Sequence, residues 1–116
     1  MKVDTVAEKL LAKILTPSKV CEKEIRRFCA FERISELLNG VTSDTLLVSG
    51  KLNPQLLRVA ELFEVPAICI LGDTFPDPEM IKAAIENETM LMVSSLGKKE
   101  VCERLTRCLD EEVTEP

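Results

Sequence analysis

Residues 45–94 contain three short apolar runs, Leu46-Leu47-Val48-Ser49-Gly50, Ala67-Ile68-Cys69-Ile70-Leu71 and Met90-Leu91-Met92-Val93-Ser94. Each run is almost entirely apolar, which is typical of a strand that is buried on both faces of a parallel sheet. The segments between the runs space their apolar residues as amphipathic helices do, and helices are the usual crossovers between parallel strands. The stretch therefore predicts a right-handed βαβαβ unit and an α/β fold.

Two proline dipeptides, Asn53-Pro54 and Asp77-Pro78, mark where the two crossover helices should begin. Asn and Asp side chains cap helices, and proline at the first helical position costs no hydrogen bond. A last helix is expected after Gly97, with one apolar side formed by Val101, Cys102, Leu105, Cys108 and Leu109. Residues 112–116 have no apolar pattern, so we expect a frayed tail there.

The first 44 residues should add elements on both sides of this unit. Apolar residues at three- and four-residue steps predict a helix from about Asp4 to Leu11. Residues 13–16 either continue that helix or form a short strand, and a further short strand is expected near residues 27–30. A helical stripe, Phe31, Ile34, Leu37 and Leu38, should end at the C-cap Asn39-Gly40. Together these elements predict a single three-layer domain over residues 1–116, with a mostly parallel sheet flanked by helices.

The length and composition narrow the class of protein. A chain of 116 residues can bury one core, and its 46% hydrophobic and 30% charged residues give a globular balance. No apolar run approaches the ~18 residues of a membrane span. Residues 1–5 lack the basic and apolar regions of a signal peptide. We therefore expect a cytoplasmic protein that does not bind a membrane.

The charge and the missing residue types exclude several functions. The net charge of -5 argues against nucleic-acid binding, which depends on a basic surface. The chain has no histidine, which removes Ser-His-Asp and Cys-His catalysis and His-ligated metal sites. Its five cysteines form no C-x-x-C pair, and Cys69, Cys102 and Cys108 occupy apolar positions as small core residues. We expect no metal and no cofactor.

Polar residues and glycines follow each of the three predicted strands. In a doubly wound sheet the carboxyl ends of the strands meet at one edge, where such folds bind ligands. The candidate ligand-binding residues are Ser49, Gly50, Lys51 and Asn53 in the first loop, Gly72, Asp73 and Thr74 in the second, and Ser94 and Ser95 in the third. Lys51 precedes a helix and suits a phosphate or a carboxylate, although Pro54 removes one N–H donor. The alternative is that these residues only form turns and helix caps.

Catalytic signatures are absent from the same loops. The P-loop pattern G-x-x-x-x-G-K-[ST] does not occur, since Leu52 follows Lys51. Asp73 could be compared with a phospho-accepting aspartate, but it lacks the neighbouring acidic cluster that would hold Mg²⁺. We therefore expect no enzymatic activity.

A resemblance is carried by Leu46-Leu47-Val48-Ser49-Gly50, by residues 65–72, by Pro76-Asp77-Pro78-Glu79 and by the strand that ends at Ser94 before a final helix. These strings and their order resemble the DRTGG domain, which is also similar to the N-terminal domain of HPr kinase/phosphorylase, over most of the chain. The motif that names the family is altered. Glu22 and Lys23 stand where the family has Asp and Arg, and Arg26-Arg27-Phe28 replaces Thr-Gly-Gly, whose glycines allow positive φ.

The resemblance implies a regulatory or sensing module without catalysis of its own. We therefore expect a stand-alone module that binds a small anionic metabolite, such as a nucleotide or a phosphorylated compound, or a protein partner, and that forms a homo-oligomer. One alternative is a structural interaction domain that dimerises through an apolar surface at Phe28 and Phe31 or at Met90 and Met92. Another is a small enzyme that uses Lys51, Asp73 or a thiol.

Overall fold

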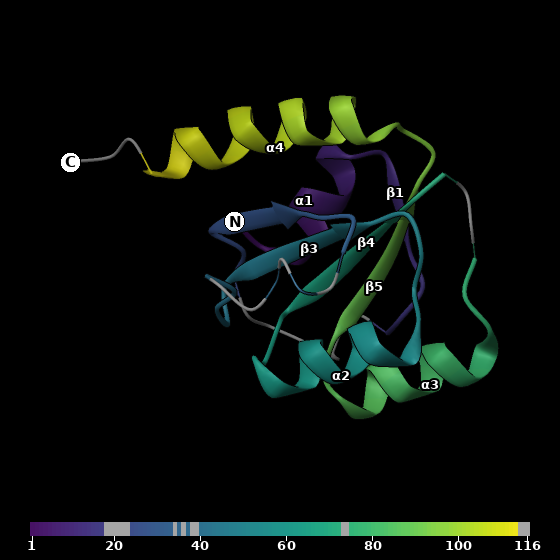
Figure 1. Cartoon of the computed structure of the whole chain (residues 1–116). Helices are drawn as coiled ribbons and strands as arrows, with labels where there is room; N and C mark the ends of the chain where they lie inside the picture. The colour runs from purple at the N-terminus through teal and green to yellow at the C-terminus, as the bar shows by residue number, and fades with distance from the viewer. Residues whose placement is uncertain (18–23, 34, 36, 38–39, 73–74, 114–116) are drawn as a thin grey trace.

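A five-stranded sheet with the strand order β1-β5-β4-β3-β2 forms the centre of the computed structural model (Figure 1). The strands are β1 (Ala12–Ile14), β2 (Arg27–Ala30), β3 (Thr45–Ser49), β4 (Ala67–Leu71) and β5 (Met90–Ser94). Strands β2 to β5 run parallel, and β1 pairs antiparallel with β5 at one edge. The structure describes residues 1–17, 24–33, 35, 37, 40–72 and 75–113, the last four of these by their backbone alone.

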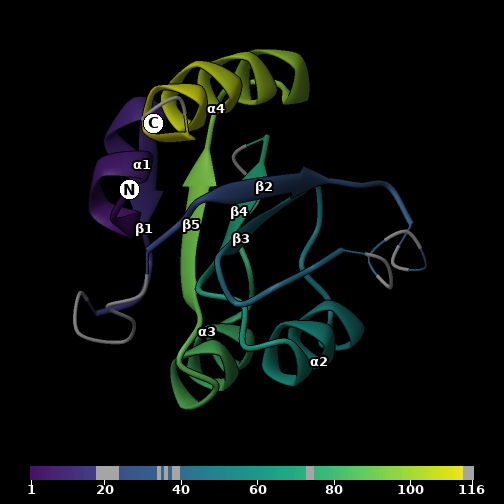
Figure 2. The same ribbon diagram turned by 90° about the vertical axis from the view of Figure 1, so that its left-hand side faces the viewer.

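Two helices cover each face of the sheet. The crossover helices α2 (Pro54–Leu62) and α3 (Pro78–Glu86) lie side by side on one face, and α1 (Val3–Lys9) and α4 (Lys98–Val113) lie on the other. Figure 2 shows the two helical layers above and below the strands. The predicted α/β fold, a three-layer domain with a mostly parallel sheet, is confirmed.

The core is divided in two by the sheet, as the alternation of side chains along a strand requires. In β3, Leu46 and Val48 pack in the cluster beneath α1 and α4, whereas Leu47 packs in the cluster beneath α2 and α3. All residues of β3 and β5 are buried. The apolar runs therefore belong to strands buried on both faces, which is why they show no alternation with polar residues.

The first helix ends earlier than the sequence pattern predicted. It ends at Lys9, and Leu11 has a φ of 53°, a left-handed conformation that reverses the chain into β1. The alternative of a short strand after the helix is confirmed by β1, and the strand predicted near residues 27–30 is β2. The apolar runs and the proline dipeptides located β3 to β5, α2 and α3 correctly.

The predicted helix over residues 31–38 falls partly outside the described residues, which exclude Ile34, Leu38 and Asn39. Of the described positions in that stripe, Phe31 and Leu37 are buried and pack in the cluster beneath α2 and α3. Residues 35 and 37 have the conformation of a 3₁₀ turn. Phe31 and Leu37 therefore lie against the same face of the sheet as the two crossover helices.

The proposed dimer surface at Met90 and Met92 is wrong. Both side chains are at most 1% exposed, because β5 lies between β4 and β1 and is covered by the cluster beneath α1 and α4. Phe31 is buried as well, and Phe28 is half-buried on the edge strand β2. Methionines in a strand with apolar neighbours are usual residues of a hydrophobic core, as the sequence around Met90 and Met92 already indicated.

None of the helices in the described part of the chain has the length and apolar character that a bilayer span needs.

Candidate functional site

A cleft of 420 Å³ opens at the carboxyl ends of β2 and β3, the edge at which ligands bind in folds of this type. Its lining comes from the residues after β2, from the loop after β3 and from the beginning of α4. The residues that bear on binding are Phe31, Glu32, Ser49, Gly50, Lys51 and Lys98. The first of the three predicted loops, which follows β3, therefore lines this cleft. The residues after β2 and the beginning of α4 also line it, and the sequence analysis had not connected these two segments with that loop.

The loop after β3 is held by one side chain. The hydroxyl of Ser49 donates a hydrogen bond to the carbonyl oxygen of Lys51 at 2.8 Å and accepts one from the Lys51 N–H at 3.3 Å. Between them, Gly50 borders open space, since a Cβ atom there would meet no atom within 4 Å. The turn thus fixes the backbone while the Lys51 side chain extends into solvent.

The two lysines of the cleft differ in their partners. Lys98 forms an ion pair with Glu32, with 3.6 Å between Nζ and Oε1, and the Glu32 side chain is 82% exposed. Exposed pairs of this kind contribute little stability, so an anionic ligand can replace Glu32 at modest cost. Lys51 takes part in none of the ion pairs found among the described residues. Its ammonium group is therefore the available cation of the cleft.

The amino end of α2 contributes less to the cleft than its position suggests. Asn53 lines the cleft, but its side-chain oxygen already accepts a hydrogen bond from the N–H of Leu56 at 2.8 Å. Pro54 has no N–H to donate. Asn53 therefore has the capping role that the sequence analysis kept as the alternative, and an anion here would depend on the lysine side chains.

Replacing Asn53 with alanine should lower the free energy of unfolding by about 0.5–2 kcal/mol, because the Leu56 N–H loses its acceptor. Asp77→Ala is the matched control. Asp77 holds the same N-cap position before a proline at the beginning of α3, but its side chain makes no capping hydrogen bond. Urea denaturation of both variants measures the difference, and equal losses would contradict the role of the Asn53 cap.

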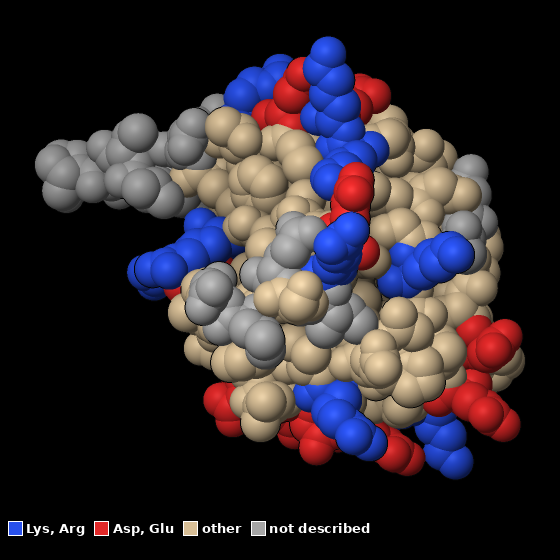
Figure 3. Space-filling view, viewed as in Figure 1, with Lys and Arg blue, Asp and Glu red and all other residues tan. Residues whose placement is uncertain are grey.

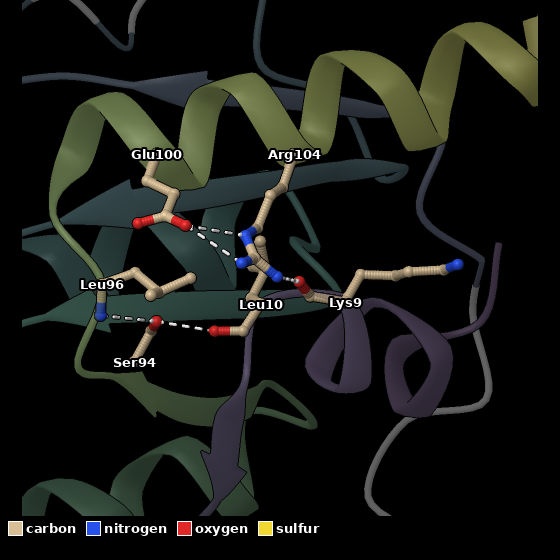
Figure 4. Close-up of polar contacts among 6 residues, drawn as sticks. All are labelled: Lys9, Leu10, Ser94, Leu96, Glu100 and Arg104. Atoms are coloured by element: carbon tan, nitrogen blue, oxygen red, sulfur yellow. Dashed lines mark hydrogen bonds and ion pairs between the residues drawn. The ribbon is translucent and has the colours of Figure 1, made fainter.

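Ser94, the candidate at the end of β5, lies inside the protein and outside the cleft. Its hydroxyl is fully buried, donates to the carbonyl oxygen of Leu10 at 2.8 Å and accepts from the Leu96 N–H at 3.2 Å. Figure 4 shows these bonds beside Arg104, whose guanidinium donates to the Lys9 carbonyl oxygen at 3.0 Å and pairs with Glu100. Ser94 and Arg104 thus attach the end of α1 to β5 and α4.

Two of the remaining candidates, Gly72 and Ser95, are not brought into the cleft. Ser95 and Gly72 are exposed, and neither lines the cleft. Gly72 donates its N–H to the carbonyl oxygen of Ser94 at 3.0 Å and has a φ of 79°. Glycine adopts this positive φ without strain, so the turn after β4 accounts for a glycine at this position. Asp73 and Thr74 lie outside the described residues.

The sequence analysis identified neither Lys98 nor Glu32 as a residue of the site. Glu32 follows the end of β2, and Lys98 begins the helix that follows β5. Positions of this kind lie near the ligand-binding edge of such sheets, and this was the signal that could have identified both residues. Their meeting with Lys51 depends on how the strands are ordered in the sheet. That order brings residues 32, 51 and 98 together although they are far apart in the chain.

The buried thiol of Cys69 is unreactive, and the described residues form no metal site. Burial raises the pKa of the Cys69 thiol to about 12, so this thiol is neutral and inert near neutral pH. Among the described residues there is no group of three or more Cys, Asp and Glu side chains that could hold a metal ion.

On the face drawn in Figure 3, basic side chains are scattered among acidic and uncharged ones without a continuous basic surface.

Comparison with known proteins shows a relationship at the level of the fold. No family model matches the sequence. The chain is similar in structure to the regulatory region of Clostridium perfringens pyrophosphatase, which contains CBS and DRTGG domains and was crystallised with its activator diadenosine tetraphosphate. The TM-score is 0.71 at 11% sequence identity, over 95% of this chain and 49% of the other. The chain, spanning about half the length of that neighbour, thus shares a fold with part of a CBS and DRTGG regulatory region, while membership of the DRTGG family stays a prediction.

Proposed function

We propose that this protein is a cytoplasmic, non-catalytic regulatory module that binds a small anionic metabolite or a nucleotide in the cleft beside Lys51. The observation that carries the proposal is the available ammonium group of Lys51 at a strand-end cleft whose second cation, Lys98, is paired with the exposed carboxylate of Glu32. Ser49, Gly50 and Asn53 frame this position. The pyrophosphatase neighbour, whose activator is a nucleotide, supports the same class of function.

The ionisable side chains of the cleft favour binding over turnover. Its described lining holds two lysines and Glu32, which is exposed and already paired with Lys98. General acid–base catalysis needs a proton donor or acceptor held within hydrogen-bond reach of the reacting atom. An exposed carboxylate that is already paired with a lysine is poorly placed for that role, so the cleft suits recognition of charge.

A thermal-shift screen with nucleotides and sugar phosphates tests the proposal. A ligand at ~100 times its dissociation constant stabilises the native protein by about 2.7 kcal/mol, which raises the unfolding midpoint of a domain of this size by several degrees. In Lys51→Ala we expect the affinity to fall about tenfold or more, because the available cation is lost. Lys82→Ala is the matched control, since Lys82 is exposed on α3 and does not line the cleft.

Two outcomes would contradict the proposal. If a ligand stabilises Lys51→Ala as much as the unaltered protein, its site lies elsewhere. If no anionic compound raises the midpoint, the protein is not a sensor of such ligands and the interaction domain becomes the better hypothesis.

We also propose that the module acts as a homo-oligomer. The outermost strand β2 supports this, since no described strand pairs with its far edge and Phe28 on it is only half-buried. Edge strands of this kind are templates for pairing with another chain. Analytical ultracentrifugation measures the mass of the protein in solution, and we expect a mass above that of the monomer. A monomer at all concentrations would overturn the proposed homo-oligomer.

A further inference from the structure

A second cavity, of 240 Å³, shares Lys51 with the cleft. It is called the groove below, and its walls are formed by Leu52, Ile70, Phe75, Pro76 and Met80. These residues come from the loop before α2, from the end of β4, from the segment that leads into α3 and from the first turn of α3. One lysine therefore stands between a polar cleft and an apolar groove.

The groove exposes an aromatic ring that the core does not use. The Phe75 side chain is 57% exposed, although burying a phenylalanine is strongly favourable. Lys13 of β1 holds its ammonium group 6.0 Å from the centroid of the ring, within the range of a cation–π contact. The ring is thus positioned beside the groove with much of its surface open to a ligand.

The charges around the two cavities differ in a way that orients a ligand. Besides Lys51, the charged residue among the described lining of the groove is Asp77, which disfavours a phosphate beside it, whereas Lys13 approaches the Phe75 ring without lining the groove. The Asp77 carboxylate makes no capping hydrogen bond to α3, so its oxygens can accept from an amino group. A phosphate is better placed in the cleft, between Lys51 and Lys98.

We infer that the cleft and the groove form one bipartite site for a nucleotide, with the phosphate in the cleft at Lys51 and Lys98 and the base in the groove against Phe75. The inference rests on the proposed function and specifies its ligand class. A sugar phosphate would satisfy the cleft alone, whereas a nucleotide also covers the apolar wall and the exposed ring. Aromatic stacking accepts any base, and losing it lowers affinity by roughly tenfold to a hundredfold.

Isothermal titration with AMP, GMP and ribose 5-phosphate tests the inference, because the last compound lacks only the base. We expect AMP or GMP to bind at least about tenfold more tightly than ribose 5-phosphate. Phe75→Ala should abolish that preference and leave the affinity for ribose 5-phosphate unchanged. Lys51→Ala should weaken the binding of all three compounds.

Leu62→Ala is the matched control, because Leu62 is 73% exposed on α2 and lines neither cavity. It should bind the three compounds as the unaltered protein does. Equal binding of AMP, GMP and ribose 5-phosphate, with no effect of Phe75→Ala, would overturn the bipartite site and leave an anion-binding module. Failure of all three compounds to bind would overturn this inference together with nucleotide and sugar-phosphate binding at the cleft.

Discussion

Replacing Leu105 with alanine is expected to lower the free energy of unfolding by about 2–5 kcal/mol. Leu105 lies on the buried side of α4, is 0% exposed and packs in the cluster between that helix and the sheet. The substitution removes apolar atoms from the core and leaves a cavity that its neighbours fill only in part. Urea denaturation, followed by circular dichroism, measures the loss.

The control for this experiment is Glu103→Ala on the exposed side of the same helix. It makes a change to alanine in the same turn without opening a cavity, so the free energy of unfolding should stay within about 0.5 kcal/mol. If Leu105→Ala were as mild as Glu103→Ala, α4 would not pack against the sheet in the way described.

The buried thiol of Cys69 should make the protein less stable in alkali. The side chain is 0% exposed, and burial raises its pKa from 9.0 to about 12. Above pH 9 the thiol ionises in the unfolded chain but stays protonated in the folded protein, so the folded state binds more protons and stability falls as pH rises. The loss should be about 1.4 kcal/mol per pH unit between pH 9 and 12, and no loss from this group is expected below that window.

Comparison with Cys69→Ala isolates this effect from the other groups that titrate in alkali. Between pH 8 and pH 10, the unaltered protein should lose about 1.4 kcal/mol more than Cys69→Ala does. The chain contains no tyrosine, which removes one common source of alkaline denaturation. Identical pH profiles for the two proteins would contradict the burial of this thiol.

The strands were predictable because their signal is local. The apolar runs at residues 46–50, 67–71 and 90–94 are long enough to indicate burial on both faces, and β3, β4 and β5 follow them closely. Asn53-Pro54 likewise locates the beginning of α2, because a cap and its helix lie within four residues of each other. Such features need no knowledge of the tertiary structure.

The composition of the cleft was only partly predictable because it depends on distant segments. Ser49, Gly50, Lys51 and Asn53 were identified, since they directly follow a predicted strand. Lys98 reaches them only through the strand order, which a single sequence does not reveal. Serines at strand ends are a further source of error, because the pattern does not distinguish an exposed hydroxyl from one, like that of Ser94, that closes a buried hydrogen bond.

The attachment of α1 has a consequence for how the chain acquires its structure. A helix of seven residues is too short to persist alone, and the carbonyl groups at its end are satisfied by Ser94 and Arg104, which lie 84 and 95 positions further along. Contacts over such separations form late, since the intervening chain must first be ordered. During synthesis α1 therefore leaves the ribosome well before the residues that hold its end, and its attachment waits until Ser94 and Arg104 have emerged.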